Sequence, residues 1–126
     1  MAAPNIVNVA TIAGITTWKA GISTLPGTPD VIASNAASSG KVIKINSLVA
    51  VAVGGTTGVT VKLYTEAAGG GSSVSIGYTM SVPSKSSLAI ISKETSLYLE
   101  ENKSIAVYKQ DAAGDIDVVC SYEDIS

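Results

Sequence analysis

The chain has 126 residues, a formal net charge of −2 at neutral pH and only 14% charged residues. This length fits a single domain that buries roughly two-thirds of its unfolded surface. All eight basic residues are lysines and histidine is absent. The acidic balance without arginine argues against nucleic-acid binding, and the lack of histidine removes the commonest general base and imidazole metal ligands.

Membrane insertion, secretion and disulfide bonding are not expected either. The longest apolar run is Leu48–Val53, far short of the roughly 18 residues that span a bilayer. The first residues, MAAPNIVNVA, lack the charged start and long apolar centre of a secretory signal. Cys120 is the only cysteine, so we expect stability to come from packing or assembly in a reducing cytoplasm.

The first twenty residues are apolar but irregular. Ile6–Ile12 alternates imperfectly, Gly14 interrupts the pattern, and Ile15–Ala20 resumes it. We predict either edge strands or an arm that packs on a partner. Trp18 fits two interpretations, a core residue or an interface anchor, since tryptophan is enriched at interface hot spots. The residues assigned here to an assembly interface are Ile6, Val7, Val9, Ile12 and Trp18.

Lys41–Val53, KVIKINSLVAVAV, is the strand around which the rest of the chain is organised. It alternates at its start and becomes apolar on both faces from Leu48 onward. One face of this second half carries valines, and the other carries Leu48 with small alanines. Because small residues let another surface approach closely, we predict the sandwich core on one side and a packed neighbour on the other. The residues predicted to face that neighbour are Leu48, Ala50 and Ala52.

Turn signals separate further short β-patterned segments. Gly21–Pro29 is predicted to be a loop, and Thr65–Ser73, with glycines at 69–71, an exposed flexible tip. Pro83 ends the segment before it, because proline cannot donate to a ladder. The predicted strands are Asp30–Ser34, Val59–Tyr64, Val74–Met80, Ser87–Ser92, Ser96–Glu100, Ser104–Lys109 and Ile116–Tyr122.

These patterns define the fold class. Short strands with turns every 8 to 12 residues or so, and no amphipathic helix, are typical of all-β sandwiches. We therefore predict an all-β fold, a single antiparallel β-sandwich that is jelly-roll-like or another Greek key. We predict that residues 1–20 form an N-terminal arm or edge strands and that residues 21–126 form the β-sandwich domain.

Two motifs resemble those of nucleophilic or phosphate-binding sites. Ser38 and Lys41 have the S-x-x-K spacing of serine acyl-enzymes, but that chemistry uses a helix start, whereas Gly40 here leads into a strand. A turn with a solvated Lys41 is the better interpretation. The same Gly40-Lys41 pair lacks the hydroxyl residue and the helix of a phosphate loop.

Three aspartates, Asp111, Asp115 and Asp117, offer oxygens for calcium, but their spacing does not match an EF-hand loop. The acidic residues near strand ends are read as solvated rather than as a catalytic pair. Asn102 lies in a formal glycosylation sequon and is better read as a turn residue. No catalytic, cofactor or metal site is predicted, so the chain is not expected to be an enzyme.

The single cysteine and the tyrosines are interpreted as structural residues. Cys120 alternates with Val118 and Tyr122, which predicts a buried small hydrophobic residue. The five tyrosines would stack on sugars if they were clustered. The favoured interpretation is that they close the ends of the sandwich with their hydroxyls in water.

Four segments carry a resemblance to a known group of proteins: PNIVNV, SSGKVIKINSLVAVAV, SLYLEENKSIAVY and the closing CSYEDIS. Together they cover most of the chain, which resembles small virion structural proteins of tailed bacteriophages, especially cyanophages. The resemblance implies a β-sandwich decoration (cement) protein of the capsid. The alternative it implies is a neck, collar or tail accessory protein or a fibre component, with Tyr64 or Tyr78 contacting host glycan.

The resemblance also implies partners and a location. The expected partners are the major capsid protein and further copies of the chain, with a trimer as the expected homo-oligomer. The expected place is the outer capsid surface of a virion, after synthesis in the host cytoplasm. A cement protein acts by mass action, since it binds and stabilises the assembled shell.

Overall fold

The computed structural model describes residues 11–22, 30–109 and 115–126, and these form an antiparallel β structure. Two single 3₁₀ turns, η1 (Ala67–Gly69) and η2 (Lys93–Thr95), are the helical elements in these segments. The all-β prediction is confirmed, and most predicted strand bounds agree with the structure to within a few residues. The strands are β1 (Ile12–Lys19), β2 (Asp30–Asn35), β3 (Val42–Ala52), β4 (Thr57–Tyr64), β5 (Ser73–Val82), β6 (Ser87–Ile91), β7 (Leu97–Leu99), β8 (Lys103–Lys109) and β9 (Ile116–Ile125).

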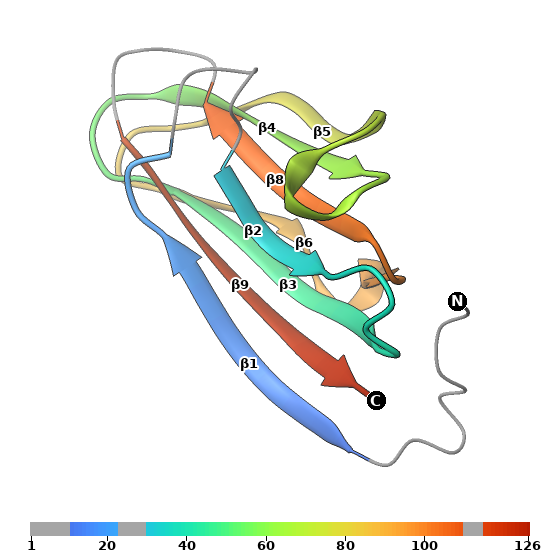
Figure 1. Cartoon of the computed structure of the whole chain (residues 1–126). Coiled ribbons are helices and arrows are strands. Elements are labelled where there is room, and N and C mark those ends of the chain that lie inside the picture. The colour runs from blue at the N-terminus through green and yellow to red at the C-terminus, as the bar shows by residue number, and fades with distance from the viewer. Residues whose placement is uncertain (1–10, 23–29, 110–114) are drawn as a thin grey trace.

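The strands form two sheets that pack face to face (Figure 1). The first sheet has the order β1-β9-β3-β6, and β7 pairs with the other half of β3. The second sheet has the order β2-β8-β4-β5. The pairs are nested: β1 with β9, β2 with β8, β3 with β6 and β7, and β4 with β5. A long hairpin rolled up in this way is a jelly roll.

The core lies between the sheets, and β3 contributes the side chains that were assigned to a neighbour. Leu48, Ala50 and Ala52 are fully buried inside the chain, whereas Val49 and Val51 lie on the outer face. The prediction that the first three face a packed neighbour is therefore corrected, because they pack in the core of their own chain. Alternation identifies two faces but does not say which one meets the opposite sheet. The alanines leave room for larger side chains from that sheet, including Val59, Val61, Ile105 and Val107.

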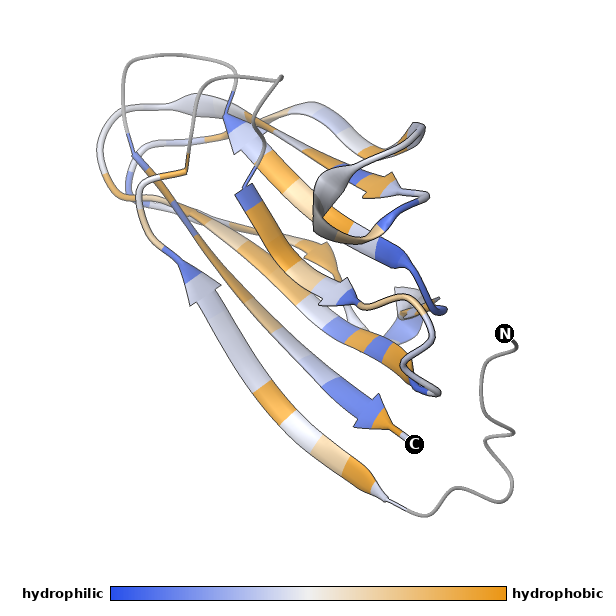
Figure 2. Ribbon diagram, in the orientation of Figure 1, coloured by the Kyte–Doolittle hydropathy of each residue, from blue (hydrophilic) through white to orange (hydrophobic). Residues whose placement is uncertain are grey.

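A β-bulge explains why β3 does not alternate along its whole length. The register between β3 and β9 shifts between Ile45 and Ser47, so Asn46 is an extra residue. Ile45 and Leu48 both face the core although they are three positions apart. The hydropathy along the ribbon shows the result, with apolar residues gathered in the middle of the sandwich (Figure 2).

Residues 12–19 form an edge strand of the first sheet. β1 pairs with β9 without interruption, and its side chains are largely exposed. Trp18 is 71% exposed, which rules out the core interpretation. Ile22, predicted to lie in a loop, is buried, and its N–H donates to the Ile116 carbonyl at 3.2 Å. Of the predicted interface residues, Ile6, Val7 and Val9 lie outside the described residues.

The segment between β4 and β5, predicted to be a flexible tip, is fixed to β8. The Ser104 hydroxyl accepts a hydrogen bond from the Gly69 N–H at 2.9 Å and donates to the Glu66 carbonyl at 2.8 Å. The Asn102 amide oxygen accepts a hydrogen bond from the Ala67 N–H at 3.1 Å. Because Ser104 is fully buried, its hydrogen bonds hold this loop against the end of the second sheet.

Candidate functional site: the outer face of the first sheet

An apolar row crosses the outer face of the first sheet. Trp18 lies opposite Val119, Val119 lies opposite Val49, and Val49 lies opposite Ala89. We call these four residues the outer apolar row. Residues directly opposite on antiparallel strands have Cβ atoms about 5 Å apart, so the four side chains are neighbours on one face.

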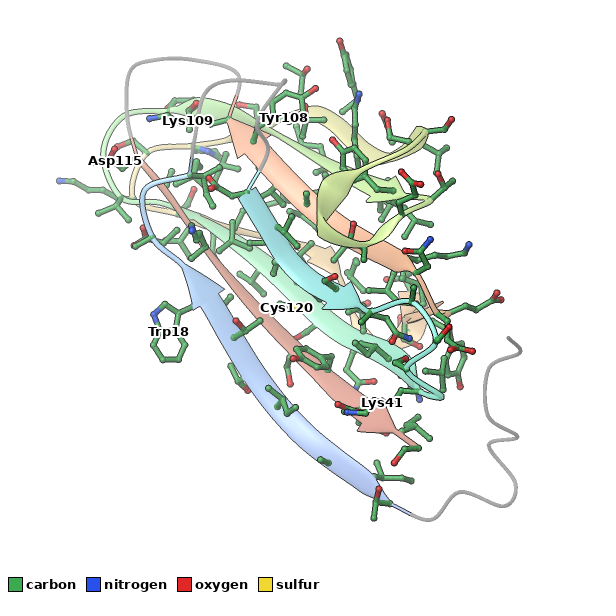
Figure 3. All side chains as sticks on the ribbon, viewed as in Figure 1. Trp18, Lys41, Tyr108, Lys109, Asp115 and Cys120 are labelled. Carbon is green, nitrogen blue, oxygen red and sulfur yellow. The ribbon has the colours of Figure 1, made fainter. Side chains whose placement is uncertain are left out.

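Solvent reaches this row. Val119 is 41% exposed, although the residues on either side of it, Val118 and Cys120, are buried in the core. Trp18 projects away from the sandwich at the edge of the sheet (Figure 3). Apolar side chains gathered on one sheet face, with tryptophan among them, have the composition of the centre of a protein–protein interface.

The same face becomes polar toward the other end of β9. Lys44 lies opposite Glu123 on one side and Tyr98 on the other. The Asn46 amide donates to the Glu123 carboxylate at 3.1 Å. The hydropathy of β9 changes accordingly, from hydrophobic in its first half to hydrophilic near its end (Figure 2). The outer apolar row therefore has a polar border, like the polar rim around the apolar centre of a protein–protein interface.

The S-x-x-K motif does not form a serine–lysine pair with a free amine. Ser38 lies in the turn before β3 with a left-handed φ of 57°. The Lys41 ammonium faces the Asp124 carboxylate at 3.3 Å. The lysine amine therefore contacts a carboxylate and not Ser38, and its side chain is 46% exposed, which agrees with the turn interpretation.

Three acidic side chains near the strand ends each have a separate contact. Glu123 binds Asn46, and Asp124 binds Lys41. Glu101 accepts a hydrogen bond from the Gly40 N–H at 3.0 Å. Paired-carboxylate chemistry needs two acids that face one reacting group, and these three face different partners.

The aspartates considered for calcium are also engaged individually. The Lys109 ammonium lies 3.8 Å from the Asp115 carboxylate, at the end of the molecule labelled in Figure 3. Asp117 accepts a hydrogen bond from the Gly21 N–H at 3.4 Å. Asp111 lies outside the described residues. Within residues 11–22, 30–109 and 115–126, no group of three acidic, cysteine or histidine side chains is placed to hold a metal ion.

Cys120 is fully buried, as predicted. Burial raises the pKa of its thiol to about 11, so the side chain is neutral at physiological pH. Burial, and then the charge of Asp124, also raise the pKa of Tyr122. A neutral buried thiol is a packing group rather than a nucleophile.

The tyrosines do not form one sugar-stacking platform. Tyr64 and Tyr108 are buried, and the Lys62 ammonium lies 5.9 Å from the ring centroid of Tyr108. Tyr78 is 66% exposed on the second sheet, whereas the exposed Tyr98 belongs to the first. Tyr64 and Tyr78, the two residues suggested for glycan contact, therefore do not offer a joint exposed surface.

Of the residues predicted for assembly, the structure leaves Trp18 and Ile12 exposed on β1 and places the β3 residues in the core. Sequence reasoning did not assign Val119 to this surface. The adjacent valines at 118 and 119 signal one inward and one outward side chain, but only the register shows that Val119 meets Trp18.

Comparison with family models and with curated proteins finds no match to this chain. The described segments contain no helix with the length and apolar character needed to cross a membrane.

Proposed function

We propose that this chain is a structural protein of a tailed-phage particle, a capsid decoration protein that binds the outer surface of the shell of major capsid protein. The observation that carries the proposal is the outer apolar row, which lies on the solvent-facing side of the first sheet and has a polar border. The phage-like segments of the sequence and the jelly-roll fold, which is common among capsid proteins, support it by analogy. In this role the chain is not an enzyme.

Trp18 is the natural anchor of such a contact. A tryptophan side chain buries about 200 Å² when covered, and Trp18 is 71% exposed in the single chain. At about 25 cal/mol per Å², covering it stabilises the complex by roughly 3 kcal/mol before ordering costs. Repeated over the copies on a shell, a gain of this size favours the assembled state by mass action.

The charge pattern suits the outside of a shell rather than its lumen. The chain is acidic overall and its basic residues are scattered lysines, so it lacks the clustered cations that hold packaged DNA. A weakly charged face also suits a contact made mainly by apolar burial. These features favour the exterior of the particle as the place of binding.

Binding to emptied shells of the parent phage tests the proposal. The protein is expected to co-sediment with shells and to raise the temperature at which they disrupt. Trp18→Ser is expected to weaken binding by about two orders of magnitude, because the anchor is lost. Tyr78→Ser is the matched control, since that side chain is similarly exposed (66%) but lies on the second sheet.

Two results would contradict the proposal. One is the absence of shell binding by the wild-type chain under conditions in which the folded state is intact. The other is a copy number per particle that matches a ring of the neck or tail rather than the number of shell subunits. That second result would favour the collar, tail or fibre alternative.

A further inference from the structure

The outer edge of β1 lacks the irregularities found at the edges formed by β2, β5 and β6. Natural edge strands are commonly interrupted by bulges, charges or proline, which prevent further strands from adding. The ladders of β2, β5 and β6 all contain register shifts, and Thr79 in β5 has a left-handed φ of 49°. β1 instead pairs with β9 without a shift over its 8 residues, contains no proline, and carries one charge, Lys19.

The hydrogen bonds at the start of β1 show which backbone groups face outward. Thr11 and Ser126 exchange both N–H···O bonds, at 3.1 and 3.0 Å. In an antiparallel ladder such pairs alternate, so the odd-numbered residues of β1 bond to β9. The even-numbered residues therefore direct their N–H and C=O groups to the free edge. In the described part of the chain no strand pairs with that edge.

We propose that β1 pairs with β1 of a second copy of this chain, antiparallel across a two-fold axis. Backbone geometry restricts the register, because only even-numbered residues on both copies can exchange hydrogen bonds. With Ile15 on the axis, Ile12 lies opposite Trp18 of the second copy and Gly14 lies opposite Thr16. This arrangement uses the full strand and joins the two first sheets into one continuous sheet.

The side chains are complementary in this register. Ile12 is 58% exposed and Trp18 71%, both on the outer face, so each copy covers an apolar side chain of the other at both ends of the contact. Gly14, diagonal to Trp18 of the second copy, has open space above its Cα, because a Cβ built there meets no atom within 4 Å. The indole can therefore lie over the glycine.

The charges also select an antiparallel pair of identical strands. The two-fold axis separates the two Lys19 side chains to opposite ends of the contact. Each Lys19, which forms an ion pair with Asp30 of its own chain at 3.9 Å, then lies near the end of β1 where Ala13 is opposite Asp124. A parallel pair would instead place the two lysines side by side, which is destabilising.

This pairing depends on strand geometry and not on the proposed function. It replaces the three-fold arrangement implied by the resemblance with a two-fold pair, the commonest closed symmetry for identical chains. It also removes an edge that would otherwise be open to uncontrolled strand addition.

Single-cysteine cross-linking of the full chain tests the register. Cα atoms of a non-hydrogen-bonded pair lie about 4.5 Å apart, within the range of a disulfide, so Ile15→Cys is expected to form a covalent dimer on mild oxidation. Ile12→Cys is the matched control, because its two copies lie six residues apart, about 20 Å, and should not cross-link. Cys120 is buried and does not compete. Equal cross-linking of both variants would refute the register.

The mass of the protein in solution tests the pairing itself. We expect a dimer by light scattering for the wild type and for Thr16→Ala. Thr16→Pro should be a monomer with an unchanged circular dichroism spectrum, because it removes an outward N–H that β9 does not use. A monomeric or trimeric wild type would overturn the proposal, as would a Thr16→Pro chain that is folded and still dimeric.

Discussion

Trp18 on β1 and Val119 on β9 lie directly opposite each other on the outer face of the first sheet, and both are exposed, by 71% and 41%. A pair of large apolar side chains in this position contributes little to the core of its own chain. The proposed shell contact includes both side chains, and the proposed strand pair includes Trp18.

Trp18 is the only tryptophan of the chain, so its fluorescence reports on this face alone. In the free protein we expect an emission between those of a solvated and a buried indole, with partial quenching by iodide, because the second copy in the β1 pair covers one side of Trp18 and leaves its outward side open. Binding to shells should shift the emission to the blue and protect it from iodide. A blue-shifted, unquenched emission from the free protein would contradict the exposure of Trp18.

The inward direction of Leu48 is tested by comparison with its neighbour. Leu48→Ala is expected to lower the free energy of unfolding by about 3 kcal/mol, because it opens a cavity in a fully buried site. Val49→Ala, on the outer face of the same strand, should cost less than about 1 kcal/mol. Urea unfolding measures both. Equal costs, or a larger cost at Val49, would mean that the two faces of β3 are assigned the wrong way round.

Three glycines separate backbone strain from steric contact. Gly71 has a φ of 76°, and an added Cβ would lie 2.5 Å from the Thr65 hydroxyl oxygen. Gly40 has a φ of 71° but open space around it, and Gly55 has open space without a left-handed φ. We therefore expect Gly71→Ala to be the most destabilising, at about 2 kcal/mol or more. Gly40→Ala should cost about 1 kcal/mol and Gly55→Ala close to none.

Thermal unfolding of the three variants measures this order. A Gly71→Ala protein as stable as the Gly55→Ala protein would mean that the loop between β4 and β5 is not built closely around Gly71. That result would restore the flexible tip predicted from the glycine run.

The buried thiol of Cys120 gives the stability a defined pH dependence. Burial raises its pKa from 9.0 to about 11 in the folded state. Below pH 9 the thiol is neutral in both states, and its contribution to stability is constant. Between pH 9 and 11 the unfolded chain ionises and the folded chain does not. The free energy of unfolding should therefore fall as the pH rises, by at most about 3 kcal/mol.

Cys120→Ala provides the control for this measurement. It should be less stable than the wild type at pH 7, because it leaves a cavity, but its stability should fall less steeply between pH 9 and 11. The difference between the two curves then reports Cys120 together with the small effect that its charge has on the pKa of Tyr122. Parallel curves for the two proteins would show that Cys120 is not shielded from solvent.

Local sequence determined the elements of this protein. β-branched residues, short-range alternation and turn residues such as Gly40 and Pro83 identify strands whose bounds agree closely with the structure. These signals act within a few residues of one another and need no knowledge of the fold. The same signals predict the all-β class, the burial of Cys120 and the absence of a long apolar span.

Only the tertiary structure decided which face of each strand is inside and which strands pair. The faces of β3 are chemically similar, so the opposite sheet, not the local pattern, decides that Leu48 is buried and Val49 is not. The bulge at Asn46, the row from Trp18 to Val119 and the nested pairing of the jelly roll join residues up to a hundred or so positions apart. Such contacts are set by packing between sheets, which no short stretch of sequence encodes.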